Sequence, residues 1–107
     1  MKRYGQIIGV KSEKLEEYKK YHAAVWPGVL EMIGVCNMRN YSIFHKDGML
    51  FAYFEYIGDD FAADMAKMAA DPTTQKWWEI MEPMQAPVET RAEGEWWSNM
   101  EQVFHVD

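Results

Sequence analysis

The sequence predicts an α+β fold whose elements follow the order β-α-β-β-α-β, the split arrangement of ferredoxin-like domains. Apolar residues alternate along residues 3–10, 39–46, 49–57 and 98–106, as they do in strands with one buried face. Apolar residues at helical spacing fill the longer segments between these runs. The chain has 107 residues, of which 49% are hydrophobic. This is enough for one core, and we expect a single domain over residues 1–107.

The first half of the chain predicts a strand followed by a broken helical region. Gly5 and Gly9 share one side of the first strand, so another part of the chain can pack closely against that side. Ser12 is expected to cap a helix that runs to about Val25, because acidic residues follow it in the first turns. Pro27 must end or kink that helix, and a second helical piece covers residues 28–37.

The turn and cap signals of the second half are local. Asp47-Gly48 predicts a two-residue hairpin turn, because both residues tolerate a positive φ. Asp59 or Asp60 is expected to cap a helix over residues 61–70. Asp71-Pro72 is expected to begin another helix that extends to residue 84.

The end of the chain predicts a link and a last strand. Residues 85–94 are polar and contain proline and glycine, which is typical of a connecting segment. From Ser98 to Val106 the alternation of apolar and polar residues returns. We therefore expect one strand over this whole range.

Charge and cysteine content exclude several classes of protein. The formal net charge is -6, and Lys and Arg are scattered, so no basic stripe is available for nucleic acid. The first apolar run is too short and too polar for a signal peptide or a membrane span. Cys36 is the only cysteine, which excludes an internal disulfide, fits a reducing cytoplasm and predicts a small buried thiol.

His22 is the first candidate for chemistry. On the helix it shares an apolar face with Tyr18 one turn before it and Trp26 one turn after it, where a core usually has Leu or Val. An isolated histidine on such a face is more often a satisfied core residue than a catalytic one. The aromatic line and a composition with 15% aromatic residues favour a pocket for a ring-shaped ligand.

Other aromatic residues are candidates for the wall of such a pocket. Trp77 and Trp78 are adjacent on a helix, so only one of them can occupy the centre of its buried face. Tyr41 alternates inward on a strand, with its hydroxyl expected at the rim of the core. Trp96 and Trp97 stand beside the link, where a lid and a subunit contact are equally compatible with the pattern.

No metal or cofactor motif is present. His45 and His105 lie at no ligand spacing from His22, and we expect them at the surface or behind the site rather than on a metal ion. The sequence has no nucleophile elbow, phosphate loop or dinucleotide fingerprint. An enzyme of this sequence is therefore expected to use a general acid or base, with no covalent step and no cofactor.

Four segments together resemble the L-rhamnose mutarotase family. They are EEYKKYHAAVWP (residues 16–27), NYSIF (40–44), QKWW (75–78) and EQVFHVD (101–107). The resemblance implies a homodimeric enzyme of the ferredoxin-like, dimeric α+β barrel type that interconverts the α and β anomers of a 6-deoxy sugar. It implies His22 as the proton donor, with contacts to the sugar from Tyr18, Tyr41, Trp77 and Trp78.

The reaction that the resemblance implies is compatible with these residue types. Mutarotation opens the hemiacetal ring by moving a proton off the anomeric hydroxyl and a proton onto the ring oxygen, and then recloses it. Imidazole can serve in both directions, because its ordinary pKa lies near neutral pH. A tryptophan would stack on an apolar face of the sugar.

Some residues depart from the family pattern. Ala23 and Gly28 stand where members of the family often have a polar residue and an acid, and PVETRAEGEWW (residues 87–97) replaces an Asn-rich stretch. These changes leave the proton donor intact and bear on the identity of the sugar. L-Fucose or another deoxyhexose is therefore an alternative substrate to L-rhamnose.

Two further functions use the same fold. In a monooxygenase-like or haem-binding domain of the dimeric α+β barrel type, His22 and the tryptophans would flank an aromatic ligand. A sugar-binding or structural dimer would bind a ligand without faster exchange of its anomers.

Overall fold

A computed structural model describes all residues from Met1 to Asp107. Its strands and helices are, in chain order, β1 (Lys2–Val10), the 3-10 helix η1 (Ser12–Lys14), α1 (Leu15–His22), α2 (Pro27–Val35), β2 (Met38–Lys46), β3 (Met49–Tyr56), α3 (Phe61–Ala70), α4 (Pro72–Met81), the 3-10 helix η2 (Glu82–Met84), β4 (Gln85–Ala86) and β5 (Ser98–Met100). None of the helices has the length and apolar composition needed to cross a membrane.

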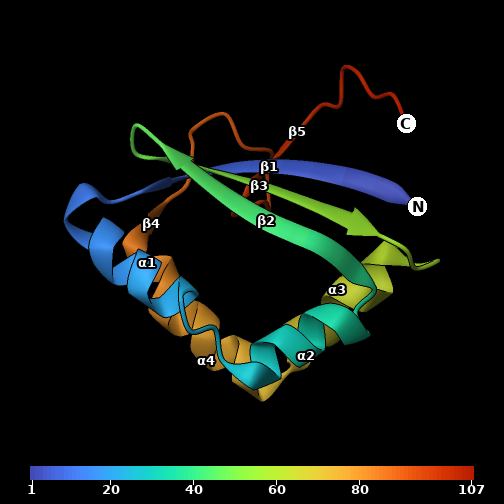
Figure 1. Cartoon of the computed structure of the whole chain (residues 1–107), viewed down its shortest axis with the longest axis horizontal. Coiled ribbons are helices and arrows are strands. Elements are labelled where there is room, and N and C mark those ends of the chain that lie inside the picture. Colours follow the sequence, from blue (N-terminus) through green and yellow to red (C-terminus); the bar gives the residue numbers. More distant parts are fainter.

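The strands form one antiparallel sheet that confirms the predicted order of elements. β2 pairs with β3, and β3 pairs with β1. The other edge of β1 is shared, because β4 pairs with Gly9 and Val10 and β5 pairs with residues 5–7. All four helices lie on one side of this curled sheet, and no helix covers the other side (Figure 1).

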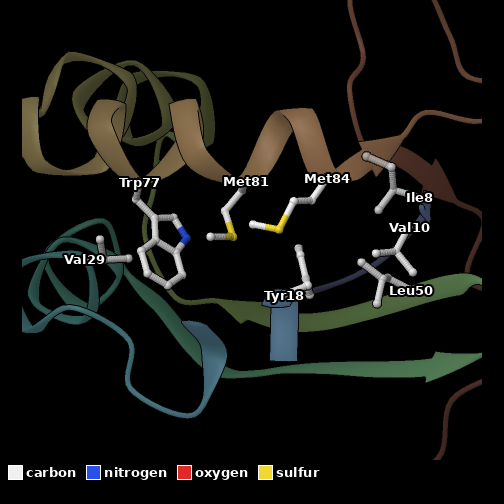
Figure 2. Close-up of a cluster of buried hydrophobic side chains, with 8 residues drawn as sticks. All are labelled: Ile8, Val10, Tyr18, Val29, Leu50, Trp77, Met81 and Met84. Atoms are coloured by element: carbon white, nitrogen blue, oxygen red, sulfur yellow. The ribbon is translucent and has the colours of Figure 1, made fainter. Parts of the chain in front are cut away.

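The core lies between the sheet and the helices. Along β3, Leu50, Ala52, Phe54 and Tyr56 are buried and alternate with partly exposed residues, as expected for a strand with one face on the core. One cluster of buried side chains joins the sheet to α1, α2, α4 and η2; its members are Ile8, Val10, Tyr18, Val29, Leu50, Trp77, Met81 and Met84 (Figure 2). A second cluster contains Cys36, Met38, Phe54 and Met68.

The local turn and cap signals are confirmed. Asp47 and Gly48 have φ angles of 51° and 76°, which is the left-handed geometry that the hairpin turn requires. Asp60, one of the two predicted caps, accepts a hydrogen bond from the Ala63 backbone N–H at 3.0 Å. Asp71 accepts one from the Thr74 N–H at 2.9 Å and so caps α4.

The prediction for the first helix was wrong at both ends. Ser12 caps no α-helix, because it lies in η1, and no side chain caps α1. The helix ends at His22, so Val25 and Trp26 lie beyond it. The reason is Pro27, which disfavours helical geometry at the residue before it; Trp26 is extended, with ψ at 135°, and the chain turns at Ala23 and Ala24 before α2.

The prediction of one strand from Ser98 to Val106 was also wrong. Only Ser98–Met100 pairs with β1, and residues 101–107 are exposed and form no regular structure. Met100 pairs with Gly5 in antiparallel register. The same register would bring residues 101–103 opposite residues 2–4 of β1, but no such pairing forms, so the alternating pattern did not determine where the strand ends.

The predicted link also contains a short strand. Gln85–Ala86 forms β4, which pairs with the end of β1. A side chain at Gly9 would place its Cβ 2.7 Å from the carbonyl oxygen of Ala86, so glycine is needed for this close approach of two backbones.

We predict that Gly9→Ala destabilises the protein. The added methyl must push β4 away from β1, and overpacking of this kind costs about 1–3 kcal/mol. Gly34→Ala is the matched control, because its Cβ would meet nothing within 4 Å and alanine is the better helix former by about 0.5 kcal/mol. Thermal unfolding of both variants measures the effect. A Gly9→Ala protein as stable as the parent would contradict the close packing of β4.

Candidate active site

A cavity of about 600 Å³ lies between the sheet and the helices, open on one side. This volume falls within the range of small-molecule sites, roughly 300–1,000 Å³. Its walls are mainly apolar and aromatic, with side chains from α1, α2, α4, β2 and β3. The five residues that the resemblance implies all line it; they are His22, Tyr18, Tyr41, Trp77 and Trp78.

His22 lies at the end of α1 and is half-buried. Its Nδ1 atom is 2.8 Å from the backbone carbonyl oxygen of Tyr18. A carbonyl oxygen only accepts, so Nδ1 must carry a hydrogen and donate it, which leaves Nε2 as the ring nitrogen available to a ligand. The imidazole stacks on the ring of Tyr18 at 4.2 Å between centroids and meets Trp77 edge-on at 5.4 Å.

Burial sets the charge of the imidazole. Desolvation lowers the pKa of His22 from its ordinary value of 6.5, and the hydrogen bond to the Tyr18 carbonyl offsets part of this effect. The ring is therefore neutral at neutral pH. In that state Nε2 carries a lone pair, and it can accept a proton.

Tyr18 lies one turn before His22 and is almost completely buried, with 4% of its surface exposed. Burial raises the pKa of its hydroxyl, and a hydrogen bond from Gln85 lowers it in part. Tyr41 lies across the cavity on β2; burial, with a smaller effect of Tyr18, raises its pKa to about 12. Both tyrosines are therefore neutral at neutral pH.

Trp77 and Trp78 differ in burial, as expected for adjacent residues of one helix. Trp77 is buried in the core cluster, with the ring directed from α4 toward Val29 and Met81 (Figure 2), whereas Trp78 is only partly buried. Neither indole N–H has a hydrogen-bond partner in the protein, and the hydroxyl of Tyr41 has none either. No fully buried polar side-chain atom lacks a partner. These three donors must therefore reach accessible space, and all three residues line the cavity.

The structure adds polar residues that the sequence did not indicate. Gln85 is buried in the cavity wall, Gln6 projects from β1, and the exposed Glu82 lies on the lining near the start of β4. Trp97 also lines the cavity, and the indole N–H of Trp96 donates to Gln85 at 2.8 Å. In the sequence, the only indication of these additional residues was the Trp96-Trp97 pair beside the link, for which we expected either a lid or a subunit contact.

The remaining candidates lie away from the cavity. His45 is exposed beside the hairpin, where its Nε2 accepts a hydrogen bond from the Gly48 N–H at 3.3 Å. His105 lies on the exposed tail and pairs with Asp107 at 2.8 Å. Cys36 is fully buried, as predicted for a small thiol of the core. No cluster of three His, Cys, Asp or Glu side chains has the arrangement of a metal site.

A model of the L-rhamnose mutarotase family matches residues 3–106. The chain belongs to this family. It is 33% identical to the L-rhamnose mutarotase of Oceanobacillus iheyensis over the full length of both chains. It is 40% identical to that of Listeria monocytogenes over 78% of this chain and 80% of the relative.

Solved structures of similar fold support the architecture of the mutarotase family. The L-rhamnose mutarotase of Formosa agariphila superposes with a TM-score of 0.77, at 22% identity, over the whole of both chains. Tetracenomycin F2 cyclase of Streptomyces glaucescens gives a TM-score of 0.75, at 15% identity, over 100% of this chain and 98% of the cyclase. The fold is thus that of the dimeric α+β barrel type, as predicted.

We predict that the imidazole of His22 titrates below pH 6.5. Burial disfavours its charged form, so the folded state binds the proton more weakly than the unfolded chain does. The contribution of this group to stability is complete above pH 6.5 and is lost as the pH falls through the lowered pKa. Titration of the ring signals by NMR measures the value, with assignment from His22→Ala. A midpoint above 6.5 would show that the ring is not desolvated as described.

Proposed function

We propose that the protein is an L-rhamnose mutarotase, which interconverts the α and β anomers of the sugar, and that residues 1–107 act as one mutarotase domain. Family membership and the names of its relatives support the substrate. One observation supports the chemistry above all others: His22 is half-buried in an aromatic cavity with one ring nitrogen committed to a carbonyl and the other available.

His22 moves a proton in both halves of the reaction. At neutral pH, Nε2 accepts the proton of the anomeric hydroxyl as the C1–O5 bond breaks, and the ring oxygen takes up a proton from a second donor in the cavity. The aldehyde then rotates about the C1–C2 bond and presents its other face to the ring oxygen. On reclosure the protonated imidazole donates to the new anomeric oxygen, so His22 is the proton donor of that half. The hydrogen bond from Nδ1 to the Tyr18 carbonyl keeps the ring oriented throughout.

The other walls of the cavity bind the sugar. The partly buried Trp78 offers a flat face for the C–H surface of a pyranose ring, and the indole N–H groups of Trp77 and Trp78 offer donors for its hydroxyl groups. Tyr41 and Tyr18 contact sugar oxygens. The methyl group of a 6-deoxy sugar has no hydrogen-bonding capacity, and the apolar side chains of α2 in the cavity wall, Val29, Leu30 and Ile33, suit it.

We expect His22→Ala to lower the rate of anomer exchange roughly 10²–10⁴-fold, the range that one general acid or base supplies. Binding of the sugar should weaken much less, because the tyrosines and tryptophans remain. The vacated volume should cost at most about 1–2 kcal/mol of stability. Saturation-transfer NMR on the anomeric protons of L-rhamnose measures the rate, and thermal unfolding measures the stability.

His45→Ala is the matched control, since His45 lies on the surface at the hairpin. It should exchange anomers at the parent rate. If His22→Ala is folded and also retains that rate, His22 is only a core histidine that faces the cavity. The same assay on L-fucose and other 6-deoxyhexoses tests the substrate.

The proposal includes a homodimer, in the cytoplasm, in keeping with the single cysteine. The side of the sheet opposite the helices exposes Phe44 to 65% and Met100 to 41%, and the tail exposes Phe104 to 78%. Apolar surface of this extent usually marks an interface. A second copy of the chain is the partner that the dimeric α+β barrel fold favours, because two such sheet faces can cover one another.

Phe44→Lys is expected to weaken the dimer. A lysine charge on the exposed face of β2 would have to be desolvated when a second copy covers that face. Val35→Lys is the control, because Val35 is 48% exposed but lies at the end of α2, on the helical side. Light scattering at micromolar concentration should show a dimer for the parent and for Val35→Lys and a larger monomer fraction for Phe44→Lys. A monomeric parent protein would contradict the dimer.

A further inference from the structure

Gln85 is a polar side chain buried where the core meets the cavity. It belongs to β4, it pairs with Val10 across the edge of β1, and only 6% of its surface is exposed. A buried amide must have its hydrogen bonds satisfied within the protein. Gln85 has a partner on each side, Trp96 and Tyr18.

The two partners fix the orientation of the amide. The indole N–H of Trp96 can only donate, so the atom that it meets at 2.8 Å must be the amide oxygen of Gln85. The NH₂ group is then the part that lies 3.2 Å from the hydroxyl oxygen of Tyr18. Since NH₂ also can only donate, the Tyr18 oxygen must accept.

The two hydrogen bonds are therefore donated in the same direction: Trp96 donates to Gln85, and Gln85 donates to Tyr18. The hydroxyl oxygen of Tyr18 receives a hydrogen bond from the protein, while its own hydrogen has no acceptor within the protein. Tyr18 lines the cavity, so this hydrogen is available to a ligand there. In the absence of Gln85 the hydroxyl could rotate and either donate or accept.

A fixed donor can serve any oxygen of a sugar, but only the ring oxygen requires a donor. Every hydroxyl of a pyranose can both donate and accept, whereas the ring oxygen can only accept. That oxygen also needs a proton when the C1–O5 bond breaks. His22 cannot supply it in the opening step, because Nδ1 is committed to the Tyr18 carbonyl and the neutral Nε2 is taking the anomeric proton.

We propose that Gln85, held by Trp96, is a positioning residue that makes Tyr18 the proton donor to the ring oxygen. This inference rests on the proposed mutarotase function. In the opening step the electron pair of the C1–O5 bond moves to O5, which takes the proton of Tyr18. The O1–H proton passes to Nε2 of His22 as C1=O1 forms. Reclosure on the other face reverses both transfers.

Two contacts stabilise the open-chain state, in which Tyr18 is a phenolate and His22 is an imidazolium. The phenolate of Tyr18 keeps the hydrogen bond from the Gln85 amide, which lowers the pKa of the tyrosine against the opposing effect of burial. The imidazolium of His22 stacks directly on that ring, at 4.2 Å between centroids. The ion pair thus forms between adjacent groups, and the two proton transfers leave the total charge of the cavity unchanged.

Gln85→Glu tests the direction of the hydrogen bonds. An ionised carboxylate only accepts, so it would take the hydrogen of Tyr18 and leave none for the sugar. A protonated carboxyl group can accept from Trp96 and donate to Tyr18, as the amide does. The other titratable groups on the cavity lining are His22, Tyr18, Tyr41 and Glu82, and they are common to variant and parent. The quantity to compare is therefore the ratio of the two rates at each pH.

We expect kcat of Gln85→Glu for L-rhamnose anomer exchange to be 10-fold to 100-fold below the parent at pH 8, with KM changed less than threefold. The ratio of variant to parent should rise toward one as the pH falls and the carboxyl group takes up its proton. Gln75→Glu on the exposed side of α4 is the matched control and should follow the parent at every pH. A ratio for Gln85→Glu that does not change with pH would overturn the inference.

A double-mutant cycle tests whether Gln85 acts through the tyrosine hydroxyl. Gln85→Met keeps the length of the side chain and removes both hydrogen bonds, and it should lower kcat at least 10-fold. In a Tyr18→Phe background the same change should have almost no further effect, because the group that Gln85 positions is already missing. Equal losses in both backgrounds would assign Gln85 a purely structural role, and thermal unfolding verifies that each variant is folded.

These outcomes distinguish the inference from the proposed function. If the parent does not accelerate anomer exchange of any 6-deoxyhexose, the proposed function fails. If the parent is active and His22→Ala is not, but both Gln85 variants keep the parent kcat, the function stands and the role of Gln85 is refuted.

Discussion

The edge of β1 that faces away from β3 is too long for β4 alone, and two short strands share it. β4 occupies the end at Gly9 and Val10, and β5 occupies residues 5–7. The chain must therefore leave the sheet after Ala86 and return at Ser98, and on its return it places Trp96 and Trp97 in the wall of the cavity. The hydrogen bond between Gln85 and Trp96 joins the departing and the returning ends of this excursion.

Burial determines the protonation states of three titratable side chains in the cavity. The chain as a whole has a formal net charge of -6. Inside the cavity, however, desolvation lowers the pKa of the base His22 and raises the pKa of the acids Tyr18 and Tyr41, so all three groups are neutral near pH 7. A neutral sugar gains nothing from long-range attraction. Its binding must depend on stacking and on hydrogen bonds formed at short range.

The sequence predicted those features that a few neighbouring residues determine. The hairpin at Asp47-Gly48 and the caps at Asp60 and Asp71 depend on backbone preferences and on hydrogen bonds to residues three positions away. The helix ending at His22 and the short last strand were not predicted correctly, because they depend on where the chain turns and on where it leaves the edge of β1. Helical spacing around His22 and Tyr18 was enough to suggest one wall of the cavity. Gln85 gave no signal, since its bond to Tyr18 joins residues 67 positions apart and a single glutamine forms no motif.

The short pairing of β4 with β1 has an evolutionary consequence. This strand has only two residues, and the excursion that follows it is held by its last two tryptophans: Trp97 packs against the first cluster of buried side chains, and Trp96 donates to Gln85. Insertions and substitutions between Ala86 and Trp96 can therefore accumulate with little effect on folding, since surface connections tolerate change far better than packed elements do. Within one scaffold, the helices and the Gln85–Trp96 pair can conserve the proton chemistry while the rest of this segment diversifies which sugar is admitted.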